Sequence, residues 1–345
     1  MSIRQLLFFL LCGLAPFTAC RLIDEDLSDC KTDYQVEYEL SLVTNFNLEL
    51  EAELGLASEV EVADALRKSL KGVFTETAHD IDLSFYDVFG DSVRLHNEHH
   101  IMDANQSSYS LLIPVRKYMH VAVANIEDNH SVNLEAADRC HSSRLVQPVR
   151  DTVESHNTGL FSARLPMDIR EGEDQQFEVN LYMANCASAL VLDSLGSRIK
   201  DIKVYASGFA TGFSLADSTY RYADKPPVVR ARRIPVEGPD ASLCFAAVTF
   251  PSREVPSSKV IIETLDPFVS EAAEYPIWNY IVYVTLSDGS VTETVLGVRL
   301  PLRAGQMKVI KVKILDDGSC VSANSLVGAS VTLKWNEQPG RNVDL

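Results

Sequence analysis

The alternation of apolar and polar positions is clearest between Tyr34 and Leu50. Every second position there except Thr44 carries an apolar side chain, and the positions between them are mostly polar or acidic. The apolar set is Val36, Tyr38, Leu40, Leu42, Phe46, Leu48 and Leu50. A period of two predicts one long β-strand, or two strands in phase, with one buried and one wet face.

The period changes between Ser58 and Phe74. Ser58 and Glu61 have the spacing of a capping box, and Gly72 stands where a helix could end. Apolar residues return at helical spacing, at Val62, Leu66, Leu70, Val73 and Phe74. This segment is predicted to be a helix.

Strand patterns occupy most of the remaining chain. They cover Ile81–Phe89, Tyr109–Val115, Met119–Ile126, Phe177–Met183, Ala187–Leu192, Ile199–Ala206, Leu243–Phe250, Lys259–Leu265, Ile277–Leu286, Val291–Leu300, Met307–Leu315 and Leu326–Trp335. Asp288-Gly289 between two of them is a hairpin signal. One helix among so many strands favours an all-β fold, a β-sandwich with one inserted helix, over an α/β unit.

A change of composition along the chain suggests two domains. Residues 127–172 are polar with few apolar runs, and all eight histidines precede residue 157. We place the boundary near residue 168, giving an N-terminal β-sandwich domain over 34–168 and a C-terminal one over 169–345. Residues 221–242 are expected to form a long surface loop.

The first thirty residues resemble a bacterial lipoprotein signal. Arg4 precedes the apolar run Leu6–Leu14, which is far shorter than the ~20 residues that span a bilayer. Cys20 follows Ala19, although Phe17 stands where the pattern prefers Leu. We therefore predict a signal peptide over 1–19, a lipid on Cys20 and an acidic tether over 20–33. The alternative is a secreted chain in which Cys20 is an ordinary thiol.

The net charge limits the classes of partner that the chain can bind, and the cysteine content leaves the disulfide pairing open. The formal net charge of −17 becomes −18 when the signal, with Arg4, is removed. Such acidity argues against nucleic acid and against electrostatic docking on anionic lipid, so the lipid must hold the chain to the membrane. The pairing of the other five mature cysteines is left open: Cys30, Cys140, Cys186, Cys244 and Cys320. Those inside apolar strands are expected to be small buried hydrophobes.

Candidate chemistry is sparse. His96, His99 and His100 surround Glu98 and could meet one metal ion, but a solvated histidine-rich loop is the favoured interpretation. The cluster of Arg230, Arg232 and Arg233 suits either an acidic partner or, preferably, an exposed loop.

No catalytic motif stands out. The Gly208–Gly212 run lacks the Gly-Lys-Ser/Thr of a phosphate loop, and there is no Gly-x-Ser-x-Gly elbow. The two tryptophans, Trp278 and Trp335, lie in strand patterns and are expected in the core rather than on a sugar-stacking platform. We expect no enzyme activity, no metal and no cofactor besides the lipid.

The order of these parts resembles a known family. Cys20 is followed by an acidic stretch, Cys30 and a long alternating strand. In the second half, residues 202–215 have the sequence Ile-Lys-Val-Tyr-Ala-Ser-Gly-Phe-Ala-Thr-Gly-Phe-Ser-Leu. The C-terminal segment contains Val331-Thr-Leu-Lys-Trp335 and then Gly340-Arg-Asn-Val-Asp-Leu345. This is similar to the lipoprotein anchor subunits of fimbrillin-type fimbriae. The resemblance implies two tandem Greek-key, transthyretin-like β-sandwich domains. It also implies a place at the base of a fimbrium, facing the cell exterior from the outer membrane, with a fimbrial stalk subunit as partner and an influence on fimbrial length.

A sandwich edge can accept or donate a strand through main-chain hydrogen bonds. The candidate donor is the C-terminal strand with Val331, Leu333 and Trp335; alternatively, this strand completes the sheet of its own domain. Two other functions stay open: a surface lipoprotein that binds glycan or host protein, and a metal-dependent enzyme built on the His96–His100 segment.

Overall fold

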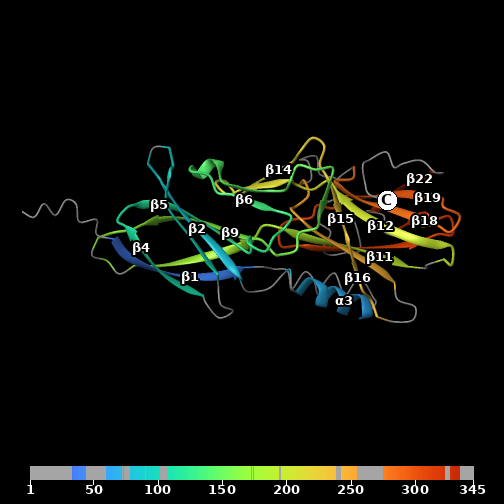
Figure 1. The fold of residues 1–345 in the computed structure, drawn as a ribbon, viewed down its shortest axis with the longest axis horizontal. Coiled ribbons are helices and arrows are strands. Elements are labelled where there is room, and N and C mark those ends of the chain that lie inside the picture. The colour runs from blue at the N-terminus through green and yellow to red at the C-terminus, as the bar shows by residue number, and fades with distance from the viewer. Residues whose placement is uncertain are drawn as a thin grey trace, which may run out of the picture.

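The computed structural model describes residues 33–43, 60–71, 73, 78–89, 91–101, 107–171, 173, 175–193, 196–237, 242–254, 275–322 and 327–334. These residues form four β-sheets and one α-helix, so the all-β prediction with a single helix is confirmed within them. The molecule is elongated, with one sheet system at each end (Figure 1). The predicted strands over 44–50 and 259–265 lie outside the described residues.

A seven-stranded sheet forms the N-terminal end. Its order is β3 (Arg94–Ile101), β2 (Asp80–Asp87), β5 (Lys117–Ala124), β9 (Phe161–Asp168), β10 (Gln176–Met183), β1 (Asp33–Val43) and β4 (Ser108–Pro114). The first strand, β1, is parallel to β10 and antiparallel to β4. A parallel neighbour needs a long crossover connection, and here most of the N-terminal half of the chain lies between the two strands.

A five-stranded and a six-stranded sheet form a sandwich at the other end. The five-stranded sheet runs β16 (Arg232–Ile234), β17 (Leu243–Thr249), β11 (Cys186–Asp193), β20 (Met307–Ile314) and β21 (Cys320–Val321). The six-stranded sheet runs β22 (Val327–Lys334), β19 (Val291–Val298), β18 (Trp278–Leu286), β12 (Ile199–Ser207), β15 (Val228–Arg230) and β8 (Thr152–Glu154). Buried apolar side chains from both sheets make one core between them.

A small four-stranded sheet bridges the two ends. It contains β14 (Thr219–Arg221), β13 (Gly212–Ser214), β7 (Arg144–Val146) and β6 (Asn133–Glu135), with a short 3₁₀ helix at Cys140–Ser142. Phe213 of β13 and Leu145 of β7 share a buried cluster with the outer face of β5, through Val121 and Val123. The polar segment 127–172 and the expected loop 221–242 thus supply strands, because pairing with distant strands compensates for their weak apolar pattern.

The predicted helix is α3 (Val60–Lys71). Its buried side chains, Val62, Ala63, Leu66 and Leu70, belong to the cluster that covers the outer face of the five-stranded sheet. The helix lies beside β16, which is far away in sequence (Figure 1). The N-terminal half of the chain therefore supplies the cover for a sheet of the C-terminal half.

The seven-stranded sheet continues past residue 168. β9 and β10 lie on either side of that position but pair within the same sheet. The next strand, β11, begins at Cys186 in the five-stranded sheet. The chain therefore leaves the seven-stranded sheet for the last time between Met183 and Cys186, because the polar turn after β9 is a hairpin connection rather than a linker.

Candidate functional site

The C-terminal strand β22 pairs with β19 along its whole length, from Val327 opposite Val298 to Lys334 opposite Val291. It stands at the end of the six-stranded sheet, so in this structure it completes a sheet of its own chain. Of the three predicted exchange residues, Val331 lies opposite Thr294 and Leu333 opposite Thr292. Trp335 lies outside the described residues. Donation of this strand to another subunit stays a prediction.

The glycine-rich segment 208–212 packs closely against neighbouring backbone. Gly208 has a φ of +97°, and a β-carbon there would come within 2.8 Å of the Trp278 Cα. A β-carbon on Gly212 would lie 3.0 Å from the carbonyl oxygen of Leu145. Glycine is needed at both positions for close approach of backbone, which explains the motif without a phosphate ligand.

The histidine-rich segment is the edge strand β3 rather than a loop. Its burial alternates strictly, and β2 pairs with it from Asp80–Ile101 to Phe85–His96. His96 and His100 lie on the half-buried face, where their Nε2 atoms contact the Glu98 carboxylate at 2.6 and 2.8 Å. His99 is on the other face, 3.5 Å from Glu127. The three imidazoles therefore do not converge, and among the described residues no group of His, Cys, Asp or Glu has the geometry to hold a metal ion.

The Glu98 carboxylate is shared by the two imidazoles. Partial burial opposes its ionisation, but the hydrogen bonds from His96 and His100 outweigh that effect and lower the pKa of Glu98. The ring of His100 also lies 4.6 Å from the ring of Tyr109 on β4. We call His96, Glu98 and His100 the polar row of β3. The two edge strands of the seven-stranded sheet, β3 and β4, therefore approach each other at this polar row. Charged side chains on the inward face of an edge strand oppose unwanted strand pairing.

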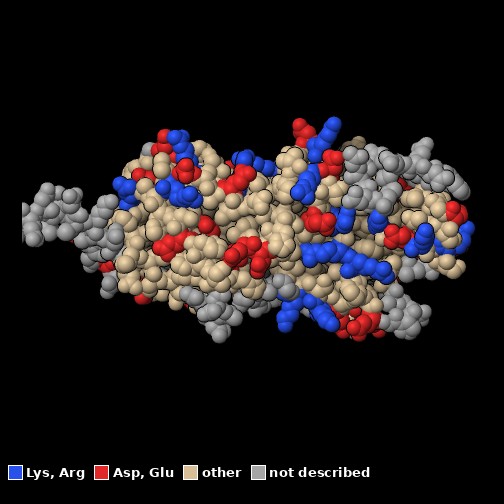
Figure 2. Space-filling view, in the orientation of Figure 1, with Lys and Arg blue, Asp and Glu red and all other residues tan. Residues whose placement is uncertain are grey.

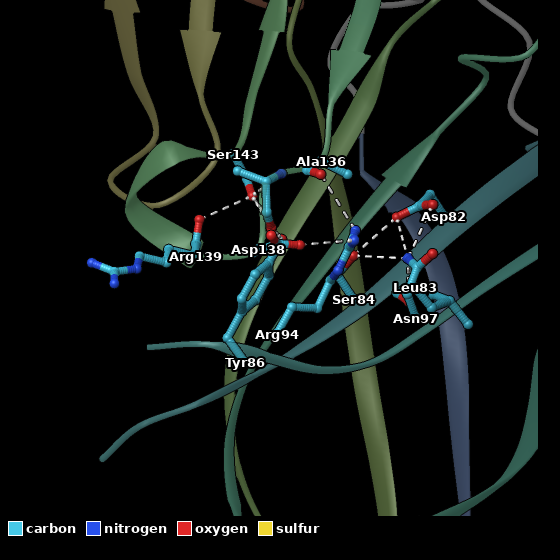
Figure 3. Close-up of polar contacts among 11 residues, drawn as sticks. Asp82, Leu83, Ser84, Tyr86, Arg94, Asn97, Ala136, Asp138, Arg139 and Ser143 are labelled. Atoms are coloured by element: carbon cyan, nitrogen blue, oxygen red, sulfur yellow. Dashed lines mark hydrogen bonds and ion pairs between the residues drawn. The ribbon is translucent and has the colours of Figure 1, made fainter. Parts of the chain in front are cut away.

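Polar contacts tie both faces of β3 to its surroundings (Figure 3). The Asn97 amide donates to the Asp82 carboxylate at 3.0 Å and to the Ser84 hydroxyl at 2.9 Å. Arg94 lies 3.7 Å from the Asp138 carboxylate, and its backbone N–H donates to the Asp138 carbonyl. These bonds fix the start of β3 against the loop that precedes the short 3₁₀ helix.

Two buried histidines, which the sequence analysis did not single out, have lowered pKa values. His120 is fully buried and stacks on Phe85 with ring centroids 4.3 Å apart. Burial lowers the pKa of His120 to about 4, despite an opposing hydrogen bond to the Ser84 carbonyl. Burial, and then the charge of Arg232, lowers the pKa of His156 to about 3. Both rings are therefore neutral at pH 7. Only the position of His120 inside an apolar strand pattern could have indicated this, because His156 lies in the polar segment after β8.

The arginine cluster belongs to strands and not to a free loop. The Arg232 guanidinium donates to the carbonyl oxygens of Ser155 and His156, which joins β16 to the segment after β8. Arg230 lies 3.7 Å from the Glu154 carboxylate. Arg232 therefore links β16 of the five-stranded sheet to the segment after β8, and Arg230 pairs across the neighbouring strands β15 and β8. Arg233 remains exposed on β16.

The described aromatic and thiol candidates are part of the core. Trp278 is completely buried, and its indole N–H donates to the Leu300 carbonyl at 2.8 Å. It cannot stack on a sugar from solvent. The four described cysteines are unpaired and buried, as expected for Cys186 and Cys244 in their strands: Cys140, Cys186, Cys244 and Cys320.

The predicted signal peptide, Cys20 and Cys30 lie outside the described residues. Within the part that the structure describes, no helix combines the length and apolar character needed to cross a bilayer.

Comparisons with known proteins give a fold. No protein-family model matches the chain, and no curated protein matches it either. Among solved structures, a candidate adhesin from Bacteroides ovatus aligns with a TM-score of 0.50 at 11% identity, covering 89% of this chain and 96% of that one. A candidate cell adhesion protein from Bacteroides eggerthii aligns with a TM-score of 0.48 at 9% identity, covering 87% and 95%. The fimbrial anchor protein Mfa2 from Porphyromonas gingivalis aligns with a TM-score of 0.46 at 13% identity, covering 87% and 99%. The likeness to the B. ovatus protein shows that this chain has the same overall fold.

Proposed function

We propose that this chain is a non-enzymatic cell-surface lipoprotein that anchors a fimbrium to the bacterial outer membrane. Its lipid is attached to Cys20, and a fimbrial stalk subunit joins it by β-strand addition. By occupying the base, it influences the length of the fimbrium. The two β-sandwich domains of this proposal divide near residue 184, after the last strand of the seven-stranded sheet.

The observation that carries the proposal is the arrangement along the molecule. β1, the first described strand, begins at Asp33, thirteen residues after Cys20. β22 lies at the opposite end of the elongated body, as the last strand of its sheet (Figure 1). A tether at one end and a terminal edge strand at the other suit a protein that links a membrane to a polymer.

The shared fold and the buried tryptophan agree with this role. The B. ovatus protein of the same fold is a candidate adhesin, which fits a place at the cell surface. A glycan-binding role would be favoured by an exposed aromatic platform, and Trp278 offers none. We therefore place anchoring ahead of glycan or host-protein binding.

The test is a Cys20→Ala substitution followed by fractionation of cells and medium. We expect fimbriae in the medium that carry this protein at one end, because the lipid is their attachment. Release of the protein alone, while fimbriae stay cell-bound and of normal length, would contradict the anchor function and favour another surface lipoprotein. A chain that stays in the membrane fraction would contradict lipidation at Cys20.

A further inference from the structure

Three turns meet at the end of the molecule where β1 begins. Asp33 lies opposite Pro114, the last residue of β4. Lys117, the first residue of β5, lies opposite Asp168. Arg116 contacts the Asp87 carboxylate at 3.5 Å, which places the β2–β3 turn beside the β4–β5 turn.

This end exposes apolar side chains that nothing in the described structure covers. Phe89 is 65% exposed, with Val88 at 38% and Val115 at 40%. The Phe89 backbone N–H donates to the Asp87 side chain, so the exposed ring sits on a turn with a defined backbone contact. We call Val88, Phe89, Val115, Arg116 and Lys117 the tether pole.

Each cation of the tether pole lies near a carboxylate. Arg116 contacts Asp87, and Lys117 lies 3.9 Å from Asp168. Figure 2 shows basic and acidic side chains close together at this end. In a chain of net charge −17, an apolar end whose cations are paired is repelled by an anionic surface less than an acidic surface would be.

We propose that the tether pole docks on the bilayer itself, with Phe89, Val88 and Val115 in the headgroup region. This inference rests on the proposed lipid at Cys20. Asp33 is thirteen residues after Cys20, a reach of at most about 45 Å, so the lipid keeps the pole near the membrane. Exposed apolar side chains with long basic neighbours suit such an interface, because Arg and Lys stems cover apolar surface while their charges reach the headgroups. Docking there directs β22 away from the membrane.

The experiment uses the lipidated full chain in vesicles of phosphatidylethanolamine and phosphatidylglycerol with brominated acyl chains. Phe89→Trp places an indole at the pole, and Tyr182→Trp is the matched control. Tyr182 is also an exposed aromatic residue of the same sheet, but it pairs with Val43, about 30 Å along β1 from Asp33. The wild-type emission is subtracted in both cases.

We expect loss of most of the added emission for Phe89→Trp and none for Tyr182→Trp, because interfacial insertion reaches only about 5–10 Å. A third variant, Val115→Trp, should also lose emission. Bound protein with no quenching at residue 89 or 115 would overturn docking and leave the lipid anchor intact. Equal quenching at 89 and 182 would also overturn it, because the body would then lie flat. Failure of the chain to bind vesicles would instead refute the lipid on Cys20.

Discussion

The central strand of the C-terminal sandwich and the edge strand of the N-terminal sheet have the same period but different surroundings. In β11, Leu190 and Leu192 face the six-stranded sheet, and Ala187 and Ala189 face the cluster that includes α3. In β3 the same alternation places His96, Glu98 and His100 on the half-buried face. Because β11 is covered by apolar side chains on both faces, the stability of the sandwich depends on packing. The stability of the sheet edge at β3 depends instead on polar contacts, and therefore on pH.

The largest effect should come from the sandwich core. Trp278→Ala should lower the free energy of unfolding by about 3–5 kcal/mol, because the indole is fully buried against Phe209 and Tyr280. Urea unfolding measures the change. Phe89→Ala, in an exposed turn, is the control and should change it by less than about 0.5 kcal/mol. Similar losses for the two variants would mean that Trp278 is not a core residue.

The next effect should come from the buried histidine of the N-terminal sheet. The pKa of His120 is about 4 in the folded chain and 6.5 in the unfolded one. The unfolded chain therefore takes up a proton first as pH falls, and stability present above pH 6.5 is lost between pH 6.5 and 4. The loss attributable to His120 is about 3 kcal/mol at 1.36 kcal/mol per pKa unit.

His120→Gln should flatten this pH dependence of the unfolding free energy, whatever it does to stability at pH 7. His130→Gln, at an exposed position, is the control and should leave the dependence unchanged. An unchanged slope in His120→Gln would assign the acid sensitivity elsewhere, with His156 the next group to test.

The sequence predicted the positions of strands and of the helix better than it predicted which strands pair with each other. Strong periodicity located β2, β4, β5, α3 and the longer strands of the sandwich, because burial on one face leaves a regular pattern. Asp288-Gly289 correctly predicted a hairpin, in which Gly289 has a φ of +86° and the Asp288 carboxylate accepts a bond from the Ser290 N–H. Both signals are local.

What the sequence could not show depends on distant contacts. The β3 segment was predicted to be a loop, since histidine and glutamate are ordinarily solvated and its pairing with β2 leaves no apolar pattern. Short strands such as β8 are held by a parallel neighbour, β15, that lies about seventy residues away in the sequence. The same limit applies to the site: no local pattern says that Arg232 will bind the carbonyls of Ser155 and His156.

A smaller difference in unfolding free energy should distinguish alanine substitutions at two glycines, Gly297 on β19 and Gly328 on β22, which are paired in register. A β-carbon on Gly297 would lie 2.6 Å from the Pro276 Cγ, whereas one on Gly328 would meet nothing within 4 Å. Gly297→Ala should cost about 1–3 kcal/mol of unfolding free energy, as overpacking does. Gly328→Ala should be neutral or stabilise by up to about 1 kcal/mol. Equal losses would mean that the effect belongs to the strand pair and not to Pro276.

The smallest effect should be at the polar row of β3. Glu98→Gln removes the carboxylate that both His96 and His100 contact, and it should cost less than about 1 kcal/mol at pH 7 because the groups are partly exposed. The folded pKa of Glu98 lies below its ordinary 4.5, so its stabilisation is present above pH 4.5 and is lost as pH falls through the folded value. The variant should therefore differ from wild type at pH 6 and converge with it in strong acid. Glu127→Gln is the matched control, because its carboxylate has one histidine contact, at 3.5 Å. If Glu127→Gln loses as much as Glu98→Gln, the shared carboxylate adds nothing beyond an ordinary surface pair, and the polar row does not stabilise the edge.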